Sequence, residues 1–418
     1  MKTKLSVVNG VVRARHVVWS CLAGLALFQC RNAAAVGFRL PNQDPEAIAR
    51  GNAFAATADD PAAIYYNPAG ITQLSGTEVE AGIYAVSSGV RYTSAATGET
   101  FKTKSNFQPV PEFYAVHSLT NLPLSFGLGV YVPYGLAVDW GDQTSFRTLA
   151  EHGSVLYACV NPVAAWQILP SLSIGGGPTI NYSKAIFERG VTPRPDTDQF
   201  RFVGNDVAFG FNAGVRWQPH EMVSFGVNYR YGTTLNYRGN TVIDPYFPGS
   251  SASTASIKFP QFVVGGISFR PTKNWNIEFD LDWTDFAIDK QVVFNGTAVG
   301  NQTFLFNYRS SFMYEFGVTR NLPCNYFVSV GYFYSENSSP DANFNMIVPD
   351  SDLHLGSIGF GHKGKHWDWA AAYHFGFNPG RTVIGSQSSL NPNPFSETAD
   401  GRYRAFNQGI TASVTLKF

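Results

Sequence analysis

The sequence predicts an all-β protein, specifically a 14-stranded antiparallel transmembrane β-barrel, from its composition, its alternating segments and the lengths of its connections. Only 14% of the 418 residues are charged, 15% are aromatic and 40 are glycine. This composition suits many aromatic-rich strands better than helices. The 30 basic and 30 acidic residues balance, so net charge gives no reason to expect a nucleic-acid partner.

The first 35 residues have the order of a cleaved signal peptide. Basic residues up to Arg15 precede an apolar run from Val17 to Phe28, and the small residues Ala33-Ala34-Ala35 follow. That order is typical of secretory signals. An anchoring helix is the rival interpretation, but about 12 apolar residues fall short of the roughly 20 that span a bilayer. We expect residues 1–35 to be removed on export. No later window reaches the roughly 18 uninterrupted apolar residues of a spanning helix, so any later membrane crossing must be made by strands.

Period-two alternation is clearest in three segments, Val207–Trp217, Val223–Tyr231 and Trp275–Trp283. In each segment large apolar residues occupy every second position, and small or polar residues lie between them. Soluble β-sandwiches also alternate in this way. A uniformly large apolar face opposite a glycine-rich polar face favours a barrel with lipid outside and a packed or wet lumen inside.

The strands and their connections follow a regular rhythm. Fourteen strand candidates start near Thr77, Val110, Leu124, Ser154, Leu172, Arg201, Met222, Thr254, Asn274, Phe306, Asn325, Asp352, His366 and Gly401. Tight turns alternate with long loops, the latter at 91–107, 134–153, 188–199, 238–253, 289–305, 336–351 and 378–400. An even strand number with short turns on one rim and long loops on the other is typical of bacterial outer-membrane barrels.

The last strand supports the same location. Ile410, Ala412, Val414, Leu416 and Phe418 share one face, and Phe418 is the final residue. An amphipathic closing strand that ends in Phe resembles the signal read by the outer-membrane barrel assembly machinery. We therefore expect a monomer in the bacterial outer membrane that contacts lipid and this machinery, and no open sheet edge.

Residues 36–76 do not alternate and are expected to form a separate unit. The segment contains Val36-Gly37-Phe38-Arg39-Leu40, then Ala49 to Asp60, then Asn67-Pro68-Ala69. These motifs resemble the N-terminal hatch of the outer-membrane long-chain fatty-acid transporter family, which is FadL-like and includes aromatic-hydrocarbon channels. Tyr131–Ala137, Asp280–Asp285 and Val348–Asp352 also look familial. The small residues between 51 and 58 can form short helices that pack tightly inside a barrel.

The resemblance implies a fold and a function. Residues 36–76 would be a hatch that plugs the lumen of a barrel formed by residues 77–418. The function would be passive uptake of long-chain fatty acids or related hydrocarbons, by hatch rearrangement and lateral release through a kink in the third strand. The residues carried over to the hatch and ligand site are Phe38, Leu40, Asn67, Pro68 and Ala69. The kink would comprise Pro133, Tyr134, Gly135, Leu136 and Ala137, where proline cannot donate a strand hydrogen bond and glycine weakens pairing.

Two other functions stay open from the residues themselves. A porin for small polar solutes is suggested by inward candidates that carry charge, namely Arg216, Arg230, Glu278, Asp280, Asp282, Arg309 and Glu315. These side chains are equally able to pair with one another or with the hatch. An enzyme is disfavoured because no nucleophile motif such as G-x-S-x-G is present. Cys159 and Cys324 have no metal-binding spacing, so we expect no metal and no cofactor. Trp140 and Phe146 in the loop after the kink are candidates for substrate capture.

Overall fold

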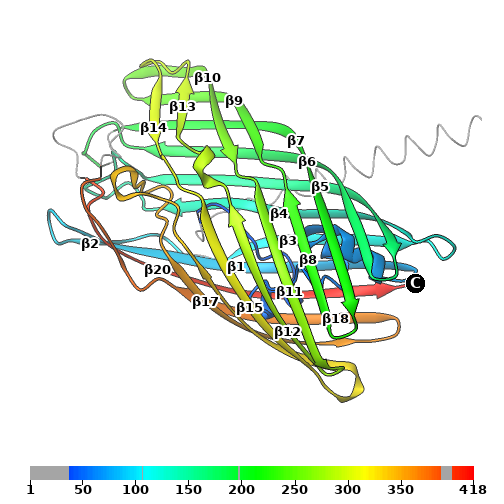
Figure 1. Cartoon of the computed structure of the whole chain (residues 1–418). Helices are drawn as coiled ribbons and strands as arrows, with labels where there is room; N and C mark the ends of the chain where they lie inside the picture. Colours follow the sequence, from blue (N-terminus) through cyan, green and yellow to red (C-terminus); the bar gives the residue numbers. More distant parts are fainter. Residues whose placement is uncertain (1–36, 106, 196–197, 387–397) are drawn as a thin grey trace, which may run out of the picture.

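The strands form one antiparallel sheet that closes into a barrel (Figure 1). The structure is a computed structural model and describes residues 37–418 except 106, 196–197 and 387–397. The expected signal peptide and its cleavage site lie outside the described residues. The strands are β1 (Thr77–Ser94), β2 (Thr100–Lys102), β3 (Gln108–Ser118), β4 (Leu124–Asp139), β5 (His152–Leu169), β6 (Leu172–Arg189), β7 (Gln199–His220), β8 (Val223–Arg230), β9 (Thr233–Asp244), β10 (Phe247–Phe259), β11 (Phe262–Thr272), β12 (Trp275–Thr284), β13 (Gln291–Asn295), β14 (Gln302–Leu305), β15 (Ser311–Asn321), β16 (Tyr326–Ser335), β17 (Leu353–Lys363), β18 (Trp367–Phe377), β19 (Arg381–Val383) and β20 (Gly401–Lys417).

The wall contains 14 crossings among these described strands. Five crossings are each divided by a short break, into β8 and β9, β10 and β11, β12 and β13, β14 and β15, and β18 and β19, while β2 only extends the hairpin after β1. The first and last crossings close the barrel, because β1 pairs with β20 on one side and with β3 on the other. Phe418 N donates to Thr77 O at 2.9 Å. The prediction of a 14-stranded antiparallel barrel is confirmed.

One end of the barrel carries the short turns and both ends of the barrel sequence. Connections of two to five residues follow β3, β5, β7, β11, β15 and β17. Figure 1 shows the C-terminus at this end, on the right, and the longer connections at the opposite end. In outer-membrane barrels the short turns are periplasmic and the longer loops extracellular.

The apolar faces of the alternating strands point outward. On β7, Phe209 is 73% exposed, whereas Asn212, three positions later on the other face, is 1% exposed. On β12, Phe279 is exposed and its neighbours Glu278 and Asp280 are buried. A soluble sandwich would have its apolar face buried instead. The choice of a lipid-facing barrel over a sandwich therefore agrees with the structure.

The alternation reverses toward the end with the long connections. On β9, Leu235 and Tyr237 are fully buried, whereas Asn236 and Arg238 are exposed. Outward polar and inward apolar side chains are what a strand needs once it has left the lipid and is surrounded by water. The barrel thus extends beyond the membrane on this side, and its upper interior is apolar.

This extension corrects two expected loops. Residues 238–253, expected to form a long loop, lie mostly in β9 and β10, and only residues 245–246 connect the two strands. Residues 289–305, also expected as a loop, contain the hairpin of β13 and β14. Both segments expose polar side chains to water, which made them look loop-like in a sequence otherwise patterned for lipid.

The N-terminal segment lies inside the barrel. It contains α2 (Pro45–Ala49), α3 (Ala63–Tyr66) and the 3₁₀-helix η1 (Pro68–Gln73), all before β1. Figure 1 shows these helices, in blue, within the barrel, and nearly all of their residues are buried. The fold class, including the short-helix hatch, is confirmed. Within the described part of the chain, no helix has the length and apolar character needed to cross a membrane.

Candidate functional site

The body of the hatch is held by two carboxylates of β12. Asp280 Oδ2 accepts hydrogen bonds from the amides of Phe54 and Ala55 at 2.9 and 2.8 Å. Glu278 Oε1 accepts from the amides of residues 56 and 57, and its other oxygen pairs with Arg50 at 2.8 Å. Hydrogen bonds to a carboxylate are among the stronger ones in proteins. The alternation of β12 places both carboxylates on the lumen face, so a single strand anchors one turn of the hatch.

Asn67, Pro68 and Ala69 extend this anchor to β7, which lies three strands along the wall from β12. Asn67 Nδ2 donates to Ala55 O at 2.8 Å and to Val215 O of β7 at 3.0 Å, and its Oδ1 caps η1 through the amide of Ala69. Pro68 occupies the first turn of η1, where its missing N–H costs nothing. The structure therefore places these three residues at the hatch body, away from the cavity described below.

The tip of the hatch is tied to β12 by Arg39. Its Nη1 lies 2.6 Å from both carboxylate oxygens of Asp282 and 2.6 Å from Thr284 Oγ1. The guanidinium also stacks over the ring of Phe262, 3.7 Å from its centroid. Arg39 and Asp282 are each about 98% buried, since their side chains are 2% exposed. Breaking such a pair on one side leaves a buried charge without compensation.

The same tip pairs with the third barrel strand, β4. Leu40 N donates to Pro133 O at 2.9 Å, and Gly135 N donates to Phe38 O at 2.8 Å. The pairing of β4 with β5 loses register between Tyr131 and Tyr134, which marks a bulge at the predicted kink. The hatch tip therefore acts as a short strand against the irregular part of β4.

Gln43 fills the remaining backbone positions at the bulge. Its Nε2 donates to Val132 O and Leu40 O, both at 2.8 Å, and its Oε1 accepts from Val132 N at 3.2 Å. Tyr114 of β3 donates to Gln43 O at 3.0 Å. An amide side chain can serve as donor and acceptor together, so Gln43 replaces a strand partner at the bulge.

The wall is discontinuous where the tip binds. The pairing of β3 with β4 runs from Ser118↔Ser125 to Phe113↔Val130 and stops there, although β4 continues to Asp139. Leu40 of the tip packs with Val110 of β3 and Val132 of β4 in one buried cluster. The break is therefore closed by hatch side chains in this structure.

A largely apolar cavity lies on the inner side of the same tip. Its lining includes Phe38, Leu136, Ala185, Phe187, Phe202, Ile257, Phe259, Val292, Phe294, Phe304, Phe306, Ile347 and Val348, with Asp289, Tyr308 and Asn345 among the polar members. Its volume is about 80 Å³, below the roughly 300–1,000 Å³ of typical ligand pockets. A long-chain ligand would therefore need a lining residue to move.

Phe38 is the lining residue that belongs to the hatch. Its ring lies 5.4 Å from the rings of Phe259 and Phe286 and 6.2 Å from that of Tyr134. Of the other carried-over positions, Leu136 lines the cavity as well, whereas Gly135 faces Leu40, whose Cδ1 would be 2.9 Å from an added Cβ. Pro133, Tyr134 and Ala137 are buried in the same stretch of β4.

The charged lumen residues are mostly engaged with the hatch. Besides the three carboxylates of β12, Arg216 donates to Ala56 O at 3.1 Å, and Arg230 bonds the hydroxyl of Tyr131. Arg309 differs from the expectation, because it lies exposed in the connection between β14 and β15. The charged residues engaged in this way thus leave little free charge of their own for a polar solute.

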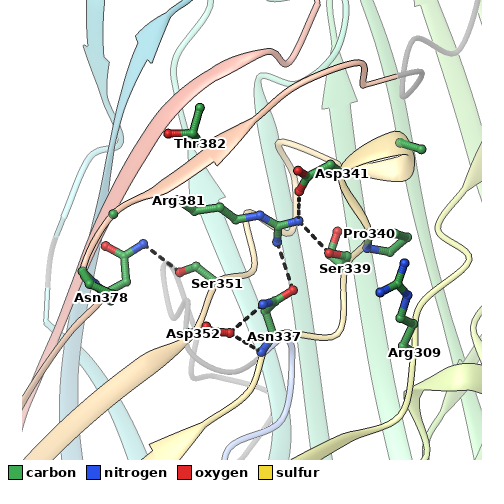
Figure 2. Close-up of a pocket in the computed structure, with 13 residues that line it drawn as sticks. Arg309, Asn337, Ser339, Pro340, Asp341, Ser351, Asp352, Asn378, Arg381 and Thr382 are labelled. Carbon is green, nitrogen blue, oxygen red and sulfur yellow. Dashed lines mark hydrogen bonds and ion pairs between the residues drawn. The ribbon is translucent and has the colours of Figure 1, made fainter.

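A polar pocket of about 550 Å³ opens among the long connections (Figure 2). Arg381 crosses it and binds Asp341, Ser339 O at 2.6 Å and Asp350 O at 2.8 Å. Because the Arg381 guanidinium is already neutralised by these partners, we interpret the pocket as a gap between packed loops. Arg309 also lines it.

Another buried ion network orders the loops after β4 and β6. Arg147 pairs with Glu151 at 2.6 Å and with Asp198 at 2.9 Å. Burial acts to raise the pKa of Asp198, but hydrogen bonds from Thr192 and Val191 and the Arg147 guanidinium outweigh it and hold that pKa below its usual range. Asp198 therefore stays ionised and holds the loops together.

Trp140 and Phe146 are not accessible for substrate capture in this structure. Both are buried, with exposed fractions of 5% and 0%. Phe146 packs edge-on against Trp140 at 5.3 Å, Tyr92 at 5.3 Å and Phe101 at 5.1 Å. The loop uses these rings to close the end of the barrel.

Several important residues were not singled out from the sequence. Arg39 and Gln43 stand within or beside the hatch motif, but nothing in their spacing indicates that they bind Asp282 and the bulge of β4. Phe259 ends β10 and Phe286 follows β12, and the common alternating pattern of these strands does not single out either residue. Only the Glu-x-Asp-x-Asp repeat of β12 gave a signal, as a row of inward carboxylates.

The comparisons with known proteins agree with this architecture. The sequence pattern of the family described as "Outer membrane protein transport protein (OMPP1/FadL/TodX)" matches residues 26–417. A long-chain fatty acid transport protein of Salmonella typhi is 21% identical over 425 aligned residues, which cover 92% of this chain and 95% of the relative.

Two solved structures share the fold. A FadL homologue of Pseudomonas aeruginosa has a TM-score of 0.81 at 16% identity and covers 91% of this chain and 100% of its own. The toluene transporter TodX of Pseudomonas putida has a TM-score of 0.70 at 14% identity, with coverages of 93% and 100%. Because the family match spans nearly the whole sequence, this chain belongs to the OMPP1/FadL/TodX family of outer-membrane transport proteins, as its N-terminal motifs had indicated.

Proposed function

We propose that this protein is a passive outer-membrane channel for hydrophobic small molecules, namely long-chain fatty acids or related hydrocarbons, and that its hatch tip couples ligand binding to a lateral exit. One observation carries the proposal. Within the tip, Phe38 lines the apolar cavity, while the backbone of Phe38 and Leu40 pairs with β4 at the wall break. The relatives described above, a long-chain fatty acid transport protein and a toluene transporter, support the substrate class.

The mechanism follows from the size of the cavity. A ligand too large for about 80 Å³ must displace a side chain, and Phe38 lies on a segment with only two backbone bonds to β4. When Phe38 moves, those bonds break and Leu40 leaves the cluster that closes the wall. The apolar ligand then passes from the cavity into lipid, where its transfer out of water is favourable. No energy source is needed.

The porin alternative has less support. The hatch fills the lumen, and the carboxylates that would select a polar solute bind hatch amides and arginines instead. We further propose that the protein acts as a monomer, because the barrel closes on itself. The outward-facing strand that ends at Phe418 is the proposed recognition element for the barrel assembly machinery.

Uptake by whole cells tests the role of the tip. In a strain lacking its own long-chain fatty-acid transporter, deletion of residues 36–40 is expected to abolish uptake of labelled oleate while the barrel still assembles. Phe209→Ala, at a lipid-facing position, is the matched control for Phe38→Ala and should retain full uptake. Unchanged oleate uptake in the deletion, or high hydrophilic flux through the intact protein, would favour a porin.

Photo-labelling tests the exit. A diazirine-bearing fatty acid, added to the purified protein in lipid vesicles, is expected to label peptides that contain residues 131–138 and 108–113 on the two sides of the wall break. Passage along the barrel axis would instead label the hatch residues 60–73 near the short-turn end. Labelling confined to that second set would rule out lateral release.

A further inference from the structure

Three carboxylates from separate segments converge beneath the hatch, at the end of the barrel with the short turns. Asp44 caps α2, Asp60 precedes α3, and Glu80 lies near the start of β1. We call these three residues the carboxylate cluster. One oxygen from each side chain lies within 4.8 Å of the others. The cluster therefore joins two parts of the hatch to the barrel wall.

The cluster is buried and short of partners. Asp44, Asp60 and Glu80 are 1%, 7% and 2% exposed. Neither oxygen of Asp60 accepts a hydrogen bond from any described residue, and Glu80 Oε1 accepts none. Glu112 on the adjacent strand β3 is 3% exposed and equally without a hydrogen bond. Native proteins rarely leave buried polar oxygens unsatisfied.

No positive side chain of the described residues forms an ion pair with the cluster. Within the described residues, the nearest ion pairs are those of Lys363, which binds Glu46 at 3.0 Å and Asp59 at 3.7 Å. No lysine or arginine in this part of the chain lies within 4.0 Å of a cluster oxygen. Burying several carboxylates without a counter-charge costs several kcal/mol for each ion. By contrast, Asp282 and Glu278, two other buried carboxylates of the lumen, each pair with an arginine.

From this geometry we propose that the carboxylate cluster binds one calcium ion, which fastens the hatch to β1. Oxygen ligands to calcium lie at about 2.3–2.6 Å from the ion, so two oxygens on one ion lie at most about 5 Å apart. The observed separations meet this limit. A site of carboxylates without histidine or cysteine selects a hard cation. Magnesium is less suited, because it keeps several waters and demands octahedral geometry.

The cluster lies toward the end of the barrel with the short turns. Glu80 pairs with Thr415 only a few residues before the C-terminus. Asp59, adjacent in sequence to Asp60, has a side chain that is 38% exposed. We therefore expect the ion to enter from the periplasmic end, at a site distinct from the apolar cavity and the wall break.

Calcium titration of the purified protein tests the proposal directly. The full-length mature protein in detergent is stripped with EDTA and titrated with CaCl₂ in a calorimeter, with metal content measured in parallel by mass spectrometry. One calcium ion per chain is expected. Asp60→Asn and Glu80→Gln should each weaken binding about tenfold or more, because each removes a charged ligand.

Asp59→Asn is the matched control. It makes the same chemical change one position away, at a carboxylate paired with Lys363, and should leave the affinity within about twofold. Folding of every variant is checked by the heat-dependent gel mobility of the barrel. Absence of calcium binding to the wild-type protein at millimolar concentration would overturn the proposal without reference to any variant. Binding that persists unchanged in both Asp60→Asn and Glu80→Gln would also overturn it.

Discussion

Replacing Arg39 with methionine is expected to release the hatch tip while leaving the barrel intact. Arg39 makes a 2.6 Å ion pair with Asp282 and a hydrogen bond to Thr284, all within a buried region. The substitution leaves Asp282 charged, buried and unpaired. Removing one partner of a buried pair typically costs about 3–5 kcal/mol.

Hydrogen exchange measures that cost locally. If the tip opens without global unfolding, amide exchange in residues 37–43 and 131–138 should accelerate by roughly 100- to 4,000-fold, at about 1.4 kcal/mol for each factor of ten. The remaining strand peptides should keep their protection. Both segments must respond together, because Leu40 and Phe38 bond Pro133 and Gly135.

Two further variants make the test specific. In Arg39→Met combined with Asp282→Leu neither charge is orphaned, and such apolar replacements are often neutral, so much of the protection should return. Arg201→Met, at the half-exposed pair with Glu188, should have no effect on the tip. Wild-type exchange rates at both segments in Arg39→Met would refute the claim that this ion pair holds the tip closed.

Three other perturbations have defined outcomes. Asn67→Ala removes two hydrogen bonds and the cap of η1, so proteolytic cleavage of the hatch should increase in step with a loss of about 1–3 kcal/mol. Gly226→Ala would place a Cβ 1.9 Å from Ala55 O, so the hatch should fail to dock and hydrophilic flux should rise, whereas Gly265→Ala, which meets nothing within 4 Å, should leave flux unchanged. The pKa of Asp198 is lowered in the folded protein, so its contribution to loop stability is full above the usual aspartate pKa and is lost as pH falls below about 4. Circular dichroism or loop proteolysis that stays constant down to pH 2 would contradict that last expectation.

The lipid-facing strands were predictable because lipid imposes a simple rule on sequence. In β7, β8 and β12 every second residue must be apolar, and the residues between must be small or engaged in the lumen. That rule predicted from the sequence that Glu278, Asp280 and Asp282 lie on the inner face. It failed for β9 and β10, because a strand surrounded by water follows the opposite polarity and resembles a loop.

The hatch contacts were less predictable for a different reason. The motif Asn67-Pro68-Ala69 is compatible with a helix start, since asparagine caps helices and proline suits the first turn. It does not indicate that Asn67 reaches Val215 on β7. Likewise, Pro133 and Gly135 suggested a broken strand, whereas the partner that replaces β3 there, the tip with Gln43, is close only in space. Contacts between residues that are 89 or 148 positions apart in the sequence leave no local pattern.

The distribution of these contacts indicates which part of the hatch can move. Its body has no freedom to slide, because a Cβ added at Gly331 or Gly226 of the wall would lie only 2.0 Å from Gly51 N or 1.9 Å from Ala55 O of the hatch. In addition, Glu278 and Asp280 hold four consecutive amides. The tip is held by two backbone bonds to β4, the pairing of Arg39 with Asp282 and Thr284, the hydrogen bonds of Gln43 at the bulge, one bond from Gly37 N to Asp350 and the packing of the Phe38 ring. A ligand that displaces this ring therefore needs to overcome only the local energy of the tip. The calcium ion proposed at Asp44 would strengthen this contrast between a fixed body and a movable tip. It would hold α2, which directly follows the tip, and leave residues 37–43 as the segment that opens.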